Sequence, residues 1–64
     1  MIVKGIISAI YPDSKTMSVI LPEYDNVVTR PIKVYRERIF RKAKVNDLVL
    51  VVIFNDDFND CMVL

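Results

Sequence analysis

Histidine is absent from this sequence, and cysteine and glycine each occur only once. Without histidine, the chain cannot assemble a Ser/His/Asp triad, a Cys/His nucleophile pair or the usual zinc ligand sets. Its one cysteine, Cys61, lies beside apolar residues, where we expect an inert buried thiol and not a redox centre. The sequence therefore predicts a non-enzymatic protein with no catalytic residues, no metal ligands and no cofactor.

The 64 residues are enough for one domain, which we expect to span residues 1–64. A core of this size rarely contributes more than about 3 to 5 kcal/mol, so small domains usually depend on disulfides, a metal or a partner. Such a chain also has little room for a cleft that separates the pKa values of two carboxyl groups. Assembly with other protein is the remaining source of stability, and we expect a homo-oligomer or other protein partners.

Long apolar runs are missing as well. Hydrophobic residues make up 53% of the chain and its mean hydropathy is +0.33. Charged residues nevertheless interrupt every stretch before it reaches the roughly 20 residues that a membrane-spanning helix needs. The N-terminus has neither the apolar core nor the cleavage site of a signal peptide, so we expect a cytoplasmic setting without a membrane span.

Short segments rich in β-branched residues, separated by turn formers, indicate an all-β fold. Five strands are predicted: Ile2 to Tyr11, Thr16 to Leu21, Val27 to Val34, Leu48 to Phe54 and Cys61 to Leu64. Gly5 lies inside the first strand and predicts a bulge or sharp bend there. Pro31 has no amide donor, so the third strand should lie at an edge or break at this residue. The spacing of the strands is typical of a small barrel.

The segment Tyr35 to Lys44 allows two interpretations. Ile39, Phe40 and Ala43 would form one narrow apolar side of a two-turn helix. A basic loop between the third and fourth strands fits the same residues nearly as well.

The predicted fourth strand, Leu48 to Phe54, is apolar at all seven positions. Alternate residues of a barrel strand face the interior, so one apolar set must face outward. Either set can be the outward one, and Val49, Val51 and Ile53 are taken as candidate interface residues. Exposed apolar sets usually mark contact surfaces, so we favour contact with another protein chain. The alternative is that Tyr35 to Lys44 folds over the outward set.

Charge is strongly segregated along the chain. Residues 30–44 contain seven Arg and Lys residues against Glu37 alone, a net charge of +6, whereas residues 45–64 carry −4. Opposite charges on separate patches favour a head-to-tail contact between copies. The candidate interface residues are Arg36, Arg38 and Arg41 on one side and Asp56, Asp57 and Asp60 on the other. We interpret the three aspartates as a solvated Asx-rich hairpin turn, because they lack the spacing of a calcium loop.

Binding of single-stranded nucleic acid is the alternative function, because Tyr24, Tyr35 and Phe40 flank or interleave the basic segment. The candidate residues for this function are Arg30, Lys33, Tyr35, Arg36, Arg38, Phe40, Arg41, Lys42 and Lys44. The acidic C-terminal third would repel a phosphate backbone, and the isoelectric point near 7.9 is modest. Assembly is therefore the favoured function.

A further set of signals follows the strand order. They are Gly5, Ile10-x-Pro12, Met17-x-Val19-x-Leu21-Pro22, Val45-Asn46-Asp47-x-Val49-Leu50-Val51, and Met62-Val63-Leu64. Their order resembles the small OB-fold domain of bacteriophage tail baseplate hub and spike proteins, which type VI secretion spike proteins share. Asn46 stands where that family usually has glycine, and asparagine also tolerates the left-handed conformation of such a turn.

This resemblance covers almost the whole chain. It implies a five-stranded OB-like barrel, typically trimeric, that forms a collar of the tail spike or joins it to the hub. It also implies a structural protein that resides in the host cytoplasm during assembly and then in the virion tail.

Overall fold

The β-branched segments form six strands in the computed structural model, which describes residues 1–64. The strands are β1 (Ile2–Tyr11), β2 (Thr16–Leu21), β3 (Val27–Val28), β4 (Ile32–Val34), β5 (Leu48–Ile53) and β6 (Cys61–Val63). A short 3-10 helix, η1 (Pro22–Tyr24), follows β2, and the one α-helix, α1 (Glu37–Lys42), connects β4 to β5. The predicted all-β fold is confirmed.

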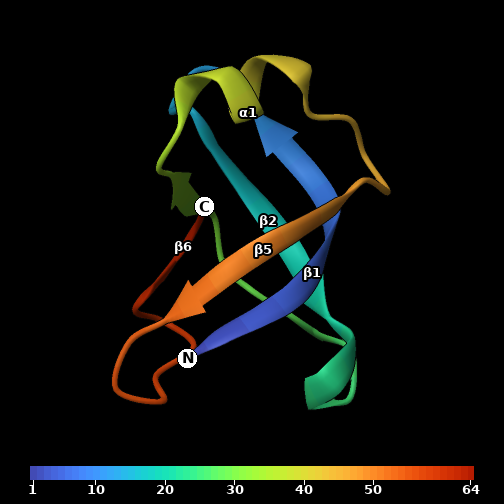
Figure 1. The fold of residues 1–64 in the computed structure, drawn as a ribbon. Coiled ribbons are helices and arrows are strands. Elements are labelled where there is room, and N and C mark those ends of the chain that lie inside the picture. The colour runs from blue at the N-terminus through green and yellow to red at the C-terminus, as the bar shows by residue number, and fades with distance from the viewer.

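Five of the strands close into a barrel (Figure 1). β1 pairs with both β2 and β5, β2 pairs with β4, and β6 lies between β4 and β5. All of these pairs are antiparallel except β4 with β6, which is parallel. The closed barrel, with its single helix between the third and fourth barrel strands, fits the predicted OB-like architecture.

The third predicted strand is divided, as its proline suggested. β3 pairs only with β2 and forms an extra strand outside the barrel, and β4 begins directly after Pro31. Between them, the buried Thr29 accepts a hydrogen bond at its Oγ1 from the Val19 N–H, at 3.1 Å. Its own N–H donates to the Val19 carbonyl at 2.8 Å. Thr29 thus provides hydrogen-bond partners for both the N–H and the carbonyl of Val19, at the point where the strand pairing is interrupted.

β1 is shared by both halves of the barrel. Ile2 to Ile6 pair with β5, and Ile6 to Tyr11 pair with β2. The bulge expected at Gly5 lies elsewhere, because the register shifts between Ile7 and Ala9. Gly5 is required for a different reason: a Cβ atom there would lie 3.0 Å from Val51 Cγ2 and 3.4 Å from Val19 Cβ. The glycine lets β1 cross closely over the side chains of two neighbouring strands.

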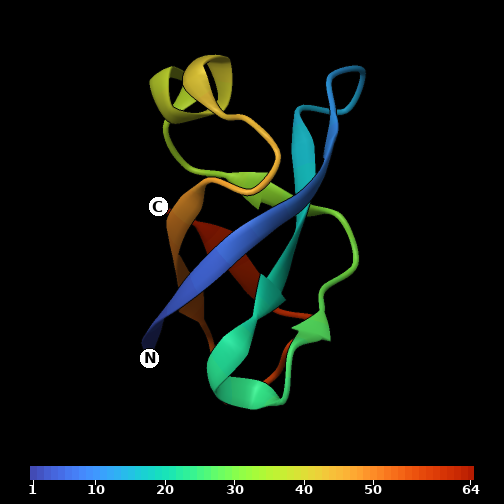
Figure 2. The ribbon, with the colours of Figure 1, turned by 90° about the vertical axis from the view of Figure 1, so that its right-hand side faces the viewer.

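Nine apolar side chains fill the barrel: Val3, Ile7, Met17, Val19, Leu21, Ile32, Val51, Ile53 and Val63. They come from five strands in the alternating positions that face inward. α1 packs Ile39 and Phe40 against this core, so the helical interpretation of the basic segment is correct. Figure 2 shows α1 and the β1–β2 turn at the same end of the barrel. No helix in the structure is long and apolar enough to cross a membrane.

The turn between α1 and β5 depends on two side chains. Asn46 adopts a positive φ of 78°, as expected for asparagine in place of glycine. The Asp47 carboxylate accepts a hydrogen bond from the Lys44 N–H at 3.0 Å. The Asn46 N–H also donates to the Ile7 carbonyl at 2.8 Å, which ties the turn to β1.

Replacing Gly5 with alanine should destabilise the barrel. The new methyl group would press on Val51 and Val19, and overpacking of this kind costs about 1 to 3 kcal/mol. The opposing gain from a stiffer unfolded chain is at most about 1 kcal/mol. Urea unfolding should show the loss, while Lys4→Ala at the neighbouring exposed position should change the free energy of unfolding little. An equally stable Gly5→Ala protein would contradict the close approach.

Candidate protein interface

β5 divides its apolar side chains between the core and the surface. Val51 and Ile53 are fully buried, so the expectation that they form the outward set is wrong. Val51 pairs with Val3 of β1 and Val63 of β6, which also face inward, and this register determines the direction of the whole strand. The outward side chains are those of the other set. Leu48 is 66% exposed and Leu50 is 49% exposed.

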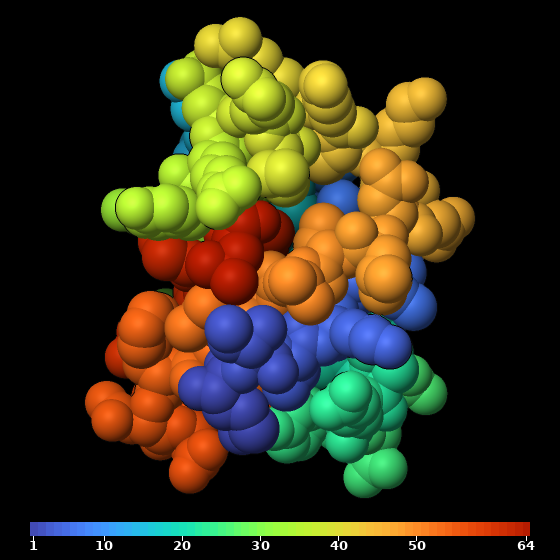
Figure 3. Space-filling view, in the orientation of Figure 1, coloured from blue at the N-terminus to red at the C-terminus, as the bar shows by residue number.

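Neighbouring strands extend this outward set into a wide surface. The register places Ile6 beside Leu48, and Ile2 beside Val52, which in turn pairs with Met62 of β6. We call this surface the apolar face; its residues are Ile2, Ile6, Leu48, Leu50, Val52, Met62 and Leu64. Figure 3 shows it from the front, with the orange atoms of β5 between the blue atoms of β1 and the red atoms of β6. Two charged side chains lie in register with this face: Lys4 opposite Leu50, and Lys33 of β4 opposite Met62.

Sequence reasoning missed the parts of the apolar face outside β5. Ile2 and Ile6 alternate with the inward Val3 and Ile7, so β1 is also apolar on both sides. That alternation was a usable signal, but which strand lies next to β5 depends on pairing between residues that are 42 (Ile6 and Leu48) to 50 (Ile2 and Val52) positions apart.

The helix does not cover the apolar face. α1 lies over the end of the barrel, and Leu48 and Leu50 remain exposed, so the alternative in which the basic segment seals the outward set is wrong. A groove of about 380 Å³ runs between α1 and the upper part of the face. Its lining residues are Arg36, Ile39, Leu48, Val49, Leu50 and Leu64. The half-buried Val49 is the one predicted interface residue of β5 that reaches this groove.

The candidate charged residues gather at two opposite ends of the barrel. Arg36, Arg38 and Arg41 are exposed on or beside α1, whereas the exposed Asp56, Asp57 and Asp60 lie in the β5–β6 turn. Figure 1 shows α1 at one end and this turn at the other. η1, at the acidic end, adds Glu23 and Asp25. The longest dimension of the molecule is 26 Å, so within one copy the two charged ends do not meet.

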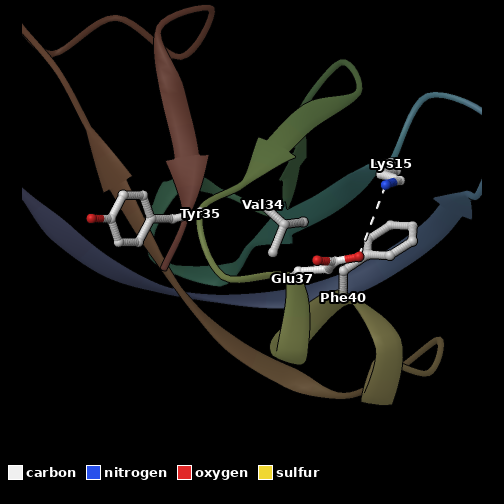
Figure 4. A pocket seen from close by; sticks show the side chains of 5 residues that line it. All are labelled: Lys15, Val34, Tyr35, Glu37 and Phe40. Carbon is white, nitrogen blue, oxygen red and sulfur yellow. Dashed lines mark ion pairs between the residues drawn. The ribbon is translucent and has the colours of Figure 1, made fainter.

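Glu37 moderates the charge of the basic end. Its carboxylate lies 3.3 Å from Arg41 and 3.9 Å from Lys15 of the β1–β2 turn. Figure 4 shows Glu37 and Phe40 beside Lys15 in a small hollow, while the Tyr35 ring points away from them. All three charged groups are well exposed, so these pairs contribute little to stability. A carboxylate between two cations also makes this hollow a poor site for a phosphate.

The acidic end is an ordered turn. The Asn59 N–H donates to Asp57 Oδ1 at 2.9 Å, the geometry of an Asx-turn. The Phe54 N–H donates to the Asp60 carbonyl at 2.9 Å, and the Asp57 N–H donates to the Phe54 carbonyl at 3.0 Å. The expected Asx-rich hairpin turn is therefore confirmed. No group of three or more Cys, Asp or Glu side chains gathers in a metal-binding arrangement.

The aromatic residues proposed for nucleic-acid stacking have different environments. Tyr24 meets Phe58 edge to face with 4.9 Å between ring centroids, and its hydroxyl donates to Met1 Sδ at 3.1 Å. Phe40 is half-buried against the core. Of these three residues, only Tyr35, which is 67% exposed, presents its ring to solvent near the basic end.

Comparison with known proteins identifies no relative: no family model, no curated protein and no solved structure matches this chain. The case for an interface therefore depends on the apolar face, the groove and the two charged ends.

Cys61 is half-buried, and its thiol donates to the Phe58 carbonyl at 3.2 Å. Burial raises the pKa of the Cys61 thiol above its ordinary value of 9.0, and the negative charges of Asp60 and Asp57 raise it further. The protonated thiol is the form that the structure favours, as expected for an unreactive cysteine.

This pKa shift predicts a pH dependence of stability. The pKa of Cys61 is higher in the folded chain than in the unfolded chain. Its contribution to the free energy of unfolding is therefore fully present below pH 9.0 and is lost as the pH rises through the pKa of the folded chain. Cys61→Ser is a matched control that keeps a donor for the Phe58 carbonyl but does not titrate in this range. Above pH 9, the free energy of unfolding of the natural chain, measured with urea, should therefore fall relative to that of Cys61→Ser. A constant difference between the two across the pH range would contradict the shift.

Proposed function

We propose that this protein is a non-enzymatic assembly subunit that self-associates by burying its apolar face. The observation that carries the proposal is the exposure of Leu48 and Leu50 within a surface built from three strands. Burying one such side chain is worth about 1.5 to 3 kcal/mol. Single exposed apolar residues are ordinary on protein surfaces, but contiguous patches of this kind mark interaction sites.

Within this class, we propose a bacteriophage or prophage tail component, a collar or adaptor at the baseplate hub or spike. Two features support it: the order of sequence signals that resembles the OB domains of those proteins, and the closed OB-like barrel. The resemblance implies a trimer that assembles in the host cytoplasm and becomes part of the virion tail.

Aspartate substitutions on β5 test the assembly proposal. Leu50→Asp should dissociate the oligomer without unfolding the barrel, because Leu50 points outward. Val51→Asp should instead unfold the chain, because it would bury an unpaired charge in the core. Light scattering measures the mass of each protein at concentrations of tens of micromolar, and circular dichroism reports folding.

Tyr11→Asp provides the control, since Tyr11 is exposed beside the β1–β2 turn and lies outside the apolar face. It should leave both mass and fold unchanged. A natural chain that is a monodisperse monomer, or a Leu50→Asp protein that keeps the oligomeric mass, would refute the proposal.

Nucleic-acid binding is the second candidate, supported by the exposed Tyr35 beside Arg36 and Arg38. OB barrels bind oligonucleotides on their second and third strands and the loops that flank them. Here those strands are β2 and β4, and one flanking loop is the β5–β6 turn with its three aspartates. These charges would repel a phosphate backbone along that path.

We expect no binding of a single-stranded oligonucleotide, measured by fluorescence anisotropy at low salt. Binding that weakens linearly with salt on logarithmic axes, and that is lost when Arg36, Arg38 and Arg41 are replaced by alanine, would favour the second candidate over assembly.

A further inference from the structure

The groove beside α1 has a chemistry that restricts what can occupy it. Its wall and floor are apolar, formed by Ile39 of the helix and by Leu48 and Leu50 of β5. Arg36 contributes a cation at the same groove. A suitable occupant combines an apolar side chain with a neighbouring carboxylate, because the apolar side chain matches the hydrophobic lining and the carboxylate matches Arg36.

The opposite end of the same strand carries this combination. Phe54, which follows β5 directly, is 44% exposed although it is a large apolar residue. Asp56 and Asp57 follow it within the turn and are exposed. The backbone hydrogen bonds of Phe54 with Asp57 and Asp60 hold the turn in one conformation, so little conformational entropy is lost when it docks.

The two elements cannot meet within one molecule. Leu48 begins β5 beside the groove, and Phe54 follows the last residue of that strand, so the length of the strand separates them (Figure 1). A second copy of the chain can supply a turn for the groove and a groove for the turn. Their charges are also opposite: the groove lies at the basic end of the barrel, and the β5–β6 turn with Phe54 lies at the acidic end.

We propose that Phe54 of one copy inserts into the groove of the next copy, where Asp56 or Asp57 pairs with Arg36. This inference rests on the proposed function, and it assigns the residues and the direction of the contact. The contact joins two different patches, so the arrangement is head to tail, and it closes into a ring, as the proposed trimer requires, when the rotation between copies permits.

Complementation between two defective variants tests the contact. Leu48→Asp damages the groove and Phe54→Asp damages the turn, and both positions are exposed, so both variants should fold. Each protein alone should have the mass of a single 7.4 kDa chain. An equimolar mixture should form pairs of twice that mass, because Phe54 of the first variant meets the intact groove of the second. Circular dichroism and urea unfolding verify that both variants are folded.

The charge pairing is tested in the same way. Arg36→Asp and Asp56→Lys should each weaken association, because each variant alone brings like charges together at the contact. Their mixture should recover association, because both alternating contacts then join opposite charges, one through the substituted pair and one through the natural pair. Val45→Asp is the matched control, an exposed apolar residue that precedes β5 but does not line the groove. It should leave the natural mass unchanged.

Two failures can be told apart. If Leu50→Asp dissociates the oligomer but the mixed variants stay monomeric, the apolar face is an interface and the Phe54 contact is wrong. If the natural chain is a monomer, both proposals are wrong.

Discussion

A strand with apolar side chains on both of its faces is the constraint on which this structure depends. β5 contributes Val51 and Ile53 to the core, where they pack among seven apolar side chains of the other four barrel strands. Because successive side chains of a strand point to opposite faces, Leu48 and Leu50 lie at the surface. The one α-helix of the structure does not cover this face.

The use of that helix follows from the geometry of a small barrel. The end of the barrel beside β4 and β5 would leave core side chains open to water, and α1 covers it with Ile39 and Phe40. Six residues present one narrow apolar stripe, which cannot cover both the barrel end and the apolar face. Leu48 and Leu50 therefore stay uncovered as a consequence of completing the core.

The positions of the strands and their turns could be predicted from local signals, whereas the same signals left a helix and a loop open for the basic segment. Pro31 interrupts pairing, Asn46 adopts the left-handed conformation, and Asp57 closes an Asx-turn, all through chemistry confined to a few neighbouring residues. Two features could not be predicted from such signals. The bulge between Ile7 and Ala9 has no marker residue, and Gly5 serves a contact with strands that are distant in sequence.

The orientation of β5 illustrates the same limit at the candidate site. Both of its residue sets are apolar, so hydrophobic alternation within the strand contains no information on which set faces inward. The decision comes from pairing with Val3 and Val63, residues from opposite ends of the chain. The exposure of the charged residues was easier to predict. Isolated Arg and Asp side chains are rarely buried, so their exposure can be expected without knowing the register.

The separation of apolar and charged surfaces bears on how copies would recognise one another. Apolar burial is non-directional and would favour any pairing of two apolar faces. Opposite charges at the two ends of the barrel distinguish among these pairings, because like ends repel and unlike ends attract. Exposed charges act weakly and within about 10 Å at moderate salt, so they select a direction more than they add affinity. In the proposed assembly the apolar face therefore supplies most of the binding free energy, and the Arg36 and Asp56 ends determine its order.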